Sequence, residues 1–330
     1  MRLLFLVNEV AGIVPRQTTT LLLMAAAREH EVWVAGVSDL SWSSPAGLRA
    51  RATRVPASEQ KNARVVAALK QRIPKRIEVE SCDAVVIRTN PGRAGDQLPS
   101  HEVALHLLAG AAQRGLPVIN DPSTLRRAAT KVYLTELPPE VVPPHIVTRD
   151  PAEVKAWLDA LDGPAVLKPV RGTRGQGVFL VDESRANLQQ IIEVVQASGY
   201  VMAQAFAKGG EKGDVRVIAV GGEVLEIDGG PAAIARVPGQ GDFRSNLAVG
   251  GKAELGVVDE AKRASLARIA DKLREDGLFY VGIDFIGDQI IELNVFSPGG
   301  LGSASEHQGH DFAGAVMRAL EAELARRTQN

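Results

Sequence analysis

Three side chains with oxygen donors lie close together in the sequence: Asp284, Glu292 and Asn294. Carboxylate and amide oxygens suit Mg²⁺ or Mn²⁺ better than zinc. Mg²⁺ held by few carboxylates usually completes its coordination shell with phosphate and water. These residue types therefore predict a divalent metal that is shared with a phosphate group. The alternative is a solvated hairpin face that carries ordinary acidic residues.

The stretch from Phe279 to Pro298 must position these three side chains. Its two apolar, β-branched runs flank Gly287-Asp288, which predicts a β-hairpin. We expect a loop with an odd number of residues, Gly287-Asp288-Gln289, because it places Asp284 opposite Glu292 and keeps charge off the other face. Two facing carboxylates repel, so a cation should lie between them. The apolar face would then comprise Ile283, Phe285, Ile291, Leu293 and Val295.

A second group of residues could bind phosphate. Lys168 ends an apolar strand predicted at 165–169, where a lysine is costly unless an anion lies nearby. The loop 171–177 that follows holds three glycines and two arginines. Its backbone N–H groups could approach a phosphate closely. Taken alone, this loop is weak evidence, because many glycine-rich hairpin loops are only turns.

The glycine-rich segment 229–251 carries Arg236, Arg244 and Asn246. A long cationic segment inside a compact domain is more often a functional lid than a structural connection. For any single arginine, the alternative is a surface ion pair that contributes little to stability.

The first part of the chain predicts a doubly wound α/β domain. Apolar runs at 2–7, 31–37 and 83–88 alternate with helical stretches at 17–29 and 102–114. This order indicates a parallel sheet with both faces covered. Segment 41–75 is rich in Arg, Ser and Pro, and we expect it to run over the surface as a loop. The first loop, 8–15, has no G-x-G-x-x-G motif, so nothing supports a dinucleotide site there.

After residue 121 the chain changes character. The pattern predicts helices at 125–134, 152–161, 188–197 and 260–276, strands at 165–169, 178–181 and 200–206, antiparallel strands from Asp214 onward, and a final helix that aligns Phe312, Val316, Leu320 and Leu324.

Composition limits the classes of partner. The chain of 330 residues has a formal net charge of −1, which gives no general attraction to nucleic acid or membranes. Its single cysteine, Cys82, rules out an internal disulfide and fits a reducing compartment. No run approaches the ~20 apolar residues of a membrane-spanning helix. We expect a cytoplasmic protein without a nucleic-acid or membrane partner.

Taken together, these features resemble the ATP-grasp ligases, and within them bacterial glutathione synthetase, over nearly the whole chain. The stretches that carry the resemblance are INDPSTLRRAATKVYL, VLKPVRGTRGQGVFLV, YVMAQAF, KGDVRVIAVGGEV, ARVPGQGDFRSNLAVGG and GLFYVGIDFIGDQIIELNVFSP. The resemblance implies a mixed α/β ATP-grasp fold with an N-terminal doubly wound (pre-ATP-grasp) domain at 1–121. A small lid subdomain at 122–203 and a C-terminal subdomain at 204–330, with the metal site and substrate loop, would follow.

The resemblance also implies a reaction. ATP would phosphorylate the terminal carboxylate of γ-glutamylcysteine, and glycine would displace the phosphate to give glutathione. The residues that would bind ATP are Lys131, Lys168, Gly172, Thr173, Arg174, Gly175, Gln176, Gly177, Gln204 and Asp214. Those that would handle the acyl phosphate and substrate carboxylates are Arg216, Arg236, Arg244 and Asn246. Asp284, Glu292 and Asn294 would hold Mg²⁺ or Mn²⁺, and the protein would be a homo-oligomer.

Two stretches differ from glutathione synthetase. After Arg88 the family usually has Asp-Pro-Pro, whereas this chain reads Thr89-Asn90-Pro91-Gly92-Arg93. After Pro298 it reads GGLGSASE, which looks more like peptide ligases that add glutamate. One alternative is therefore an ATP-grasp ligase for a different amino acid or peptide. Another is a non-catalytic ATP-binding regulatory protein. His307 and His310 receive no role from the sequence.

Overall fold

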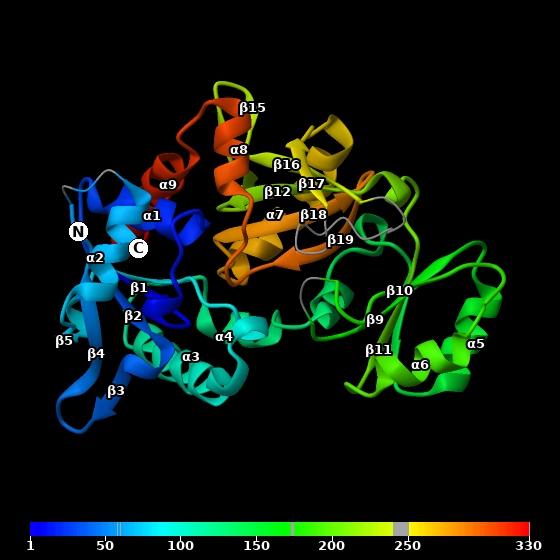
Figure 1. Cartoon of the computed structure of the whole chain (residues 1–330), viewed down its shortest axis with the longest axis horizontal. Helices are drawn as coiled ribbons and strands as arrows, with labels where there is room; N and C mark the ends of the chain where they lie inside the picture. The colour runs from blue at the N-terminus through cyan, green and yellow to red at the C-terminus, as the bar shows by residue number, and fades with distance from the viewer. Residues whose placement is uncertain (58, 60, 173–174, 240–250, 330) are drawn as a thin grey trace.

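The computed structural model describes residues 1–57, 59, 61–172, 175–239 and 251–329 (Figure 1). These residues form three main β-sheets, which follow one another along the chain. Among the described residues, no helix is both long and apolar enough to cross a membrane.

The first sheet has a parallel centre in the order β2-β1-β6-β7. Its strands are β1 (Arg2–Val7), β2 (Glu31–Gly36), β6 (Ala84–Ile87) and β7 (Val118–Ile119). The two faces are covered by α1 (Thr18–Ala27) and α3 (Leu98–Gln113), because alternate residues of β1 point into two different apolar clusters. The expected doubly wound domain is confirmed.

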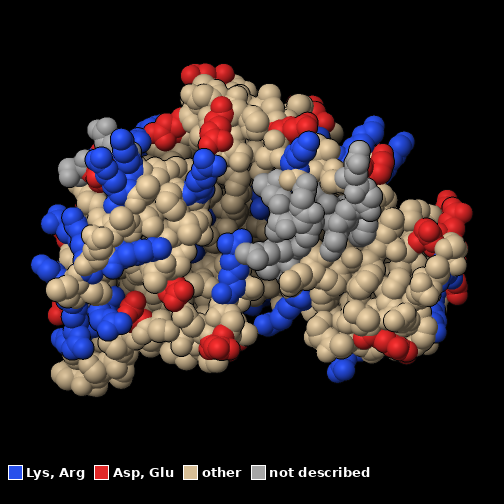
Figure 2. Space-filling view, viewed as in Figure 1, with Lys and Arg blue, Asp and Glu red and all other residues tan. Residues whose placement is uncertain are grey.

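The expected loop at 41–75 is wrong. This segment contains β3 (Leu40–Ser43), β4 (Gly47–Arg54), α2 (Asn62–Gln71) and β5 (Lys75–Glu78), and its strands extend the first sheet. Leu48, Ala50 and Ala52 are buried, while the arginines between them are more exposed. This alternation outweighs the polar composition. Figure 2 shows Lys and Arg side chains gathered over this part of the molecule.

The second sheet is antiparallel, in the order β10-β9-β11-β8. It comprises β8 (His145–Thr148), β9 (Ala165–Pro169), β10 (Phe179–Val181) and β11 (Val201–Ala205), and it packs with α5 (Pro151–Ala160) and α6 (Leu188–Gln196) around a separate apolar cluster. The helix expected at 125–134 is interrupted. It consists of α4 (Pro122–Arg127) and a 3₁₀ segment, Lys131–Glu136, whose first backbone N–H donates to the carbonyl of Val170.

The third sheet is also antiparallel, in the order β17-β16-β12-β18-β19, with β13 beside β12. Its strands are β12 (Asp214–Val220), β13 (Glu223–Val224), β16 (Ala233–Val237), β17 (Lys252–Leu255), β18 (Tyr280–Ile286) and β19 (Gln289–Asn294). A short ribbon of β14 (Glu226–Ile227) and β15 (Gly230–Pro231) and the helices α7 (Glu260–Glu275), α8 (Leu301–Gln308) and α9 (Phe312–Gln329) complete this part. Helix α9 returns to pack against α1, which joins the two ends of the chain (Figure 1).

The β18–β19 hairpin places Asp284 opposite Glu292, as expected. The expected three-residue loop is wrong, because Ile286 pairs with Gln289 across a two-residue turn. The odd residue lies inside β19 instead: Ile291 is bulged between the pairs that Asp284 and Phe285 form. Ile290, fully buried, takes the place on the apolar face that was expected for Ile291.

Replacement of Ile290 by alanine is expected to lower the free energy of unfolding by about 2–5 kcal/mol, because it removes a fully buried side chain. The chemically matched Ile291→Ala removes a half-buried side chain and should cost clearly less. Urea denaturation followed by circular dichroism measures both. A larger loss for Ile291→Ala would contradict the bulged register.

Candidate active site

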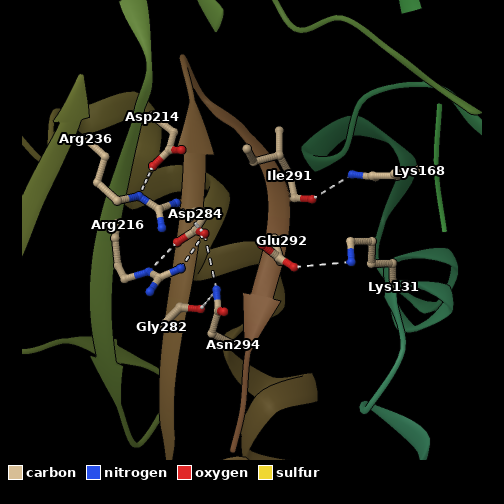
Figure 3. Close-up of polar contacts among 10 residues, drawn as sticks. All are labelled: Lys131, Lys168, Asp214, Arg216, Arg236, Gly282, Asp284, Ile291, Glu292 and Asn294. Atoms are coloured by element: carbon tan, nitrogen blue, oxygen red, sulfur yellow. Dashed lines mark hydrogen bonds and ion pairs between the residues drawn. The ribbon is translucent and has the colours of Figure 1, made fainter. Parts of the chain in front are cut away.

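The expected site residues gather around the β18–β19 hairpin. Figure 3 shows Asp214, Arg216 and Arg236 on one side of the hairpin, and Lys131 and Lys168 on the other. The arginines come from β12 and β16 of the third sheet, and the lysines belong to the 3₁₀ segment and to β9. The three expected metal ligands lie on the hairpin between these two cationic groups.

Lys131 bridges the glycine-rich loop and the hairpin. Its Nζ lies 3.6 Å from Glu292 Oε1 and donates to the carbonyl of Gly172 at 3.2 Å. Gly172 has φ of +153° and Gly177 has φ of +68°, and a Cβ on either would lie 3.4–3.5 Å from the ring of Pro169. These contacts are ordinary, so it is the positive φ that favours glycine at both positions.

Lys168 is a buried cation, only 7% exposed. Its Nζ donates to Gln204 Oε1 at 2.7 Å and makes a longer contact, 3.5 Å, with the carbonyl of the bulged Ile291. Burial, together with the nearby charge of Lys131, lowers the pKa of Lys168 to about 8, against the opposite pull of Glu292 and Asp284. The other end of the Gln204 amide, Nε2, is buried without a partner among the described residues. Lys168 thus supplies a cation, and Gln204 supplies a hydrogen-bond donor that has no partner among the described residues.

Asp284 is fully buried, and the guanidinium groups of Arg216 and Arg236 both bond to its carboxylate. Arg216 donates from Nε and Nη2 to the two carboxylate oxygens, each at 2.7 Å. Arg236 donates from Nη2 to Asp284 at 2.6 Å and from Nε to Asp214 at 2.6 Å. Burial alone would raise the pKa of Asp284, but the two guanidinium groups outweigh it and hold that pKa below its usual value. Asn294 Nδ2 adds a contact at 3.2 Å.

The donor types, two carboxylates and an amide, suit a divalent cation that is shared with another ligand, although both oxygens of Asp284 here accept from Arg216 and Arg236. Asp284 and Glu292 face each other on paired strands, and Asn294 lies beside them. No cluster of three or more His, Cys, Asp or Glu side chains suited to a metal occurs among the described residues. A set of only two carboxylates and an amide leaves coordination positions that phosphate and water would have to fill.

The remaining expected residues fall into two groups. Gly175, Gln176 and Gly177 lie in the loop between β9 and β10. Thr173, Arg174, Arg244 and Asn246 lie outside the described residues.

Sequence reasoning did not select Arg88, which is 4% exposed at the end of β6. Its Nη2 donates to the carbonyl of Pro298 at 3.0 Å, and its Cζ lies 4.9 Å from the ring centre of Tyr280. Nε and Nη1 are buried without partners among the described residues, and burial lowers the pKa of the guanidinium. A cation that ends an apolar strand is the same signal that selected Lys168.

Both halves of the chain match models of known protein families. Residues 1–126 match the model of the N-terminal domain of prokaryotic glutathione synthetase, and residues 130–309 match the model of its ATP-grasp domain. A glutathione synthetase of Synechococcus elongatus is 34% identical over 98% of each chain. One of Synechocystis is 29% identical over 97% of this chain and 99% of its own.

Solved structures support the fold over the full length. The D-cycloserine synthetase DcsG superposes with a TM-score of 0.62 at 17% identity and covers 98% of this chain and 99% of its own. The ATP-grasp ligase PsnB, solved with Mg and ADP, superposes with a TM-score of 0.62 at 17% identity, with 97% of this chain and 98% of its own covered. The two family models and the full-length relative agree: the chain belongs to the prokaryotic glutathione synthetase family.

Proposed function

We propose that the protein joins γ-glutamylcysteine and glycine at the expense of ATP, through an acyl-phosphate intermediate, and releases ADP and phosphate in the cytoplasm. Membership in the glutathione synthetase family makes it an ATP-grasp ligase. The observation that carries the finer proposal is the pair of lysines in Figure 3: Lys131 pairs with Glu292, and Lys168 contacts the neighbouring carbonyl of Ile291, on the side of the hairpin opposite the arginines that hold Asp284. That arrangement suits a triphosphate, because its negative charge needs cations nearby to neutralise it.

The nucleotide would lie between the second and third sheets. Lys131 and Lys168 would contact its phosphates, and the loop 172–177, with Thr173 and Arg174, would cover them. The unpartnered Nε2 of Gln204 supports a place for this side chain near the adenine ring, whose nitrogens accept hydrogen bonds. Asp214 would lie close by. A closed loop would also protect an acyl phosphate from water.

Asp284, Glu292 and Asn294 would hold Mg²⁺ or Mn²⁺, because their oxygens match the ligands that these ions prefer. A divalent ion bound there neutralises phosphate charge. Arg216 and Arg236, together with Arg244 and Asn246, would bind the acyl phosphate and the substrate carboxylates. Their planar guanidinium groups suit paired oxygens, as the bidentate contact of Arg216 with Asp284 illustrates.

The donor substrate would lie near the carboxyl ends of β1 and β6. These strands are neighbours, and the helices that follow them cover opposite faces of the sheet, an arrangement that opens a crevice at the strand ends. Arg88, two of whose nitrogens have no partner among the described residues, is the strongest candidate there for a carboxylate contact. We also propose the divisions 1–121, 122–203 and 204–330 as domains, which follow the three main sheets except that the second boundary falls inside β11, and a homo-oligomeric assembly.

A second candidate is a ligase of the same chemistry for another donor or acceptor. One observation favours it: Thr89, which belongs to the stretch that departs from the family, is fully buried and bonds through Oγ1 to His101 Nε2 at 2.8 Å. Its neighbour Asn90 exchanges two backbone hydrogen bonds with the side chain of Asn8. Thr89 and Asn90, which differ from the family pattern, therefore take part in the packing around the pocket proposed for the donor substrate.

With ATP and Mg²⁺, we expect phosphate release only when γ-glutamylcysteine and glycine are both present, with glutathione as the product by mass. A panel of γ-linked and α-linked dipeptides with other amino-acid acceptors forms the comparison. Turnover of another pair, without turnover of this one, would transfer the assignment to the second candidate. Silence with every pair would favour the non-catalytic reading.

Lys168→Met is expected to lower the rate of phosphate release by about 10²–10³-fold, the usual effect of removing one preorganised charge partner. Methionine fills much of the same buried space without a charge, so the fold should persist. Lys155→Met removes an exposed lysine from α5 of the same region and serves as the control. Equal activities for the two variants would return Lys168 to a structural role.

Nucleotide binding should depend on pH through Lys168. Below its pKa of about 8 this lysine keeps its proton with or without ATP. Above that pH the free protein loses the proton, and bound phosphate must restore it. ATP affinity should therefore fall by up to about tenfold per pH unit above the pKa, because one proton is linked to binding.

Calorimetry in two buffers of different ionisation enthalpy measures this uptake directly. Lys168→Arg keeps its charge throughout, so its proton uptake should be absent. The same uptake in both proteins would exclude Lys168 as the titrating group.

A further inference from the structure

Asn120, which directly follows β7, is 3% exposed and uses its whole side-chain amide on the hairpin of the active site. Its Nδ2 donates to the carbonyl of Tyr280 at 2.9 Å and to that of Val295 at 2.7 Å. Its Oδ1 accepts from the backbone N–H of Tyr280 at 2.8 Å. One side chain of the N-terminal part therefore binds the start of β18 and the residue that follows β19.

These bonds lie where the hairpin ladder has ended. The last pair of the ladder is Gly282 with Asn294, and Tyr280 and Val295 lie just beyond it, one residue out of register with each other. The amide of Asn120 connects these two residues and satisfies three buried backbone groups. It thus links the two strands just beyond the last pair of the ladder.

Two further contacts hold the same end of the hairpin against the first sheet. The backbone N–H of Asp121 donates to the carbonyl of Gly277 at 3.0 Å, and Arg88 donates to the carbonyl of Pro298 at 3.0 Å. Arg88 also lies over the Tyr280 ring, so it contacts both sides of the hairpin through one side chain and one carbonyl. Asn120 differs in that it hydrogen-bonds the backbone of both Tyr280 and Val295.

We propose that Asn120 is a positioning residue for the metal site, an inference that rests on the proposed function of the hairpin. Asn294 precedes Val295 directly, and Asp284 lies four residues along β18 from Tyr280. If the strands separate at Tyr280 and Val295, the pair formed by Gly282 and Asn294 loses its outer support. Asn120 touches no expected ligand itself and acts through the backbone that carries them.

The decisive variant is Asn120→Asp, which keeps the shape and the acceptor for the Tyr280 N–H. Its second oxygen faces the carbonyls of Tyr280 and Val295; as a carboxylate it donates to neither, and when protonated it donates to one at most. We expect Mn²⁺, titrated into the full chain with a non-hydrolysable ATP analogue and followed by electron paramagnetic resonance, to bind about tenfold more weakly, as for other residues that orient metal ligands. The Mg²⁺ concentration that gives half-maximal phosphate release should rise to match.

A purely structural role would lower stability without weakening Mn²⁺ binding by the folded protein. Leu108→Ala, a fully buried change in α3, controls for lost stability. Asn62→Asp controls for the chemical change, because the Asn62 side chain donates to the carbonyl of Pro15 in the N-terminal part. Both should bind Mn²⁺ as the unaltered protein does. Asn120→Ala leaves room for a water at the three backbone groups and provides the same test if the aspartate variant does not fold.

Normal Mn²⁺ affinity in a folded Asn120 variant would overturn the inference and leave the proposed function intact. A failure of the unaltered protein to bind Mn²⁺ with the nucleotide would overturn both.

Discussion

The ionised carboxylate of Asp284 is the group on which the geometry of the site depends. A fully buried charge needs partners, and the loss of one partner from such a pair typically costs about 3–5 kcal/mol. The pairing of the strands supplies them: Arg216 lies directly across from Asp284 on β12, and Asp214 lies across from Arg236 on the same sheet. Any slip of one residue between β12 and β18 would turn Arg216 to the other face. The charge therefore fixes the register of the strands that carry it.

The same register extends across β19. Arg216, Asp284 and Glu292 form one row over three neighbouring strands, and Lys131 lies beyond Glu292. Cations thus flank the row at both ends, while its two central members carry the same sign. The bulge at Ile291 makes this row possible after a two-residue turn and turns a backbone carbonyl toward Lys168. One irregular residue therefore serves both the carboxylate pair and the lysine side of the site.

Local periodicity in the sequence predicted the parts of the fold that alternation controls. The run at 2–7 became β1, and the segregation of charge placed Asp284 opposite Glu292. The alternation of side chains requires one extra residue between Asp284 and Glu292, but it does not show whether that residue lies in the loop or in a bulge. The predicted loop length was therefore wrong. Composition misled at 41–75, where the alternation of small apolar residues with arginines was the better guide. Asn120 could not be found this way, because its partners lie 160 and 175 residues away.

The unsatisfied groups near the site share one property. Arg88 Nε and Nη1 and Gln204 Nε2 are buried donors without partners among the described residues. Lys168 can reduce the cost of burial by losing its proton near pH 8, whereas the guanidinium of Arg88 stays charged. A buried donor left unpaired typically costs about 1–3 kcal/mol, and more when it is charged. A molecule rich in acceptors recovers that cost on binding, and phosphate, carboxylate and the adenine ring all have this character. Among the described residues, the protein thus has hydrogen-bond donors without partners on Arg88 and Gln204, where the proposed substrates would present acceptors.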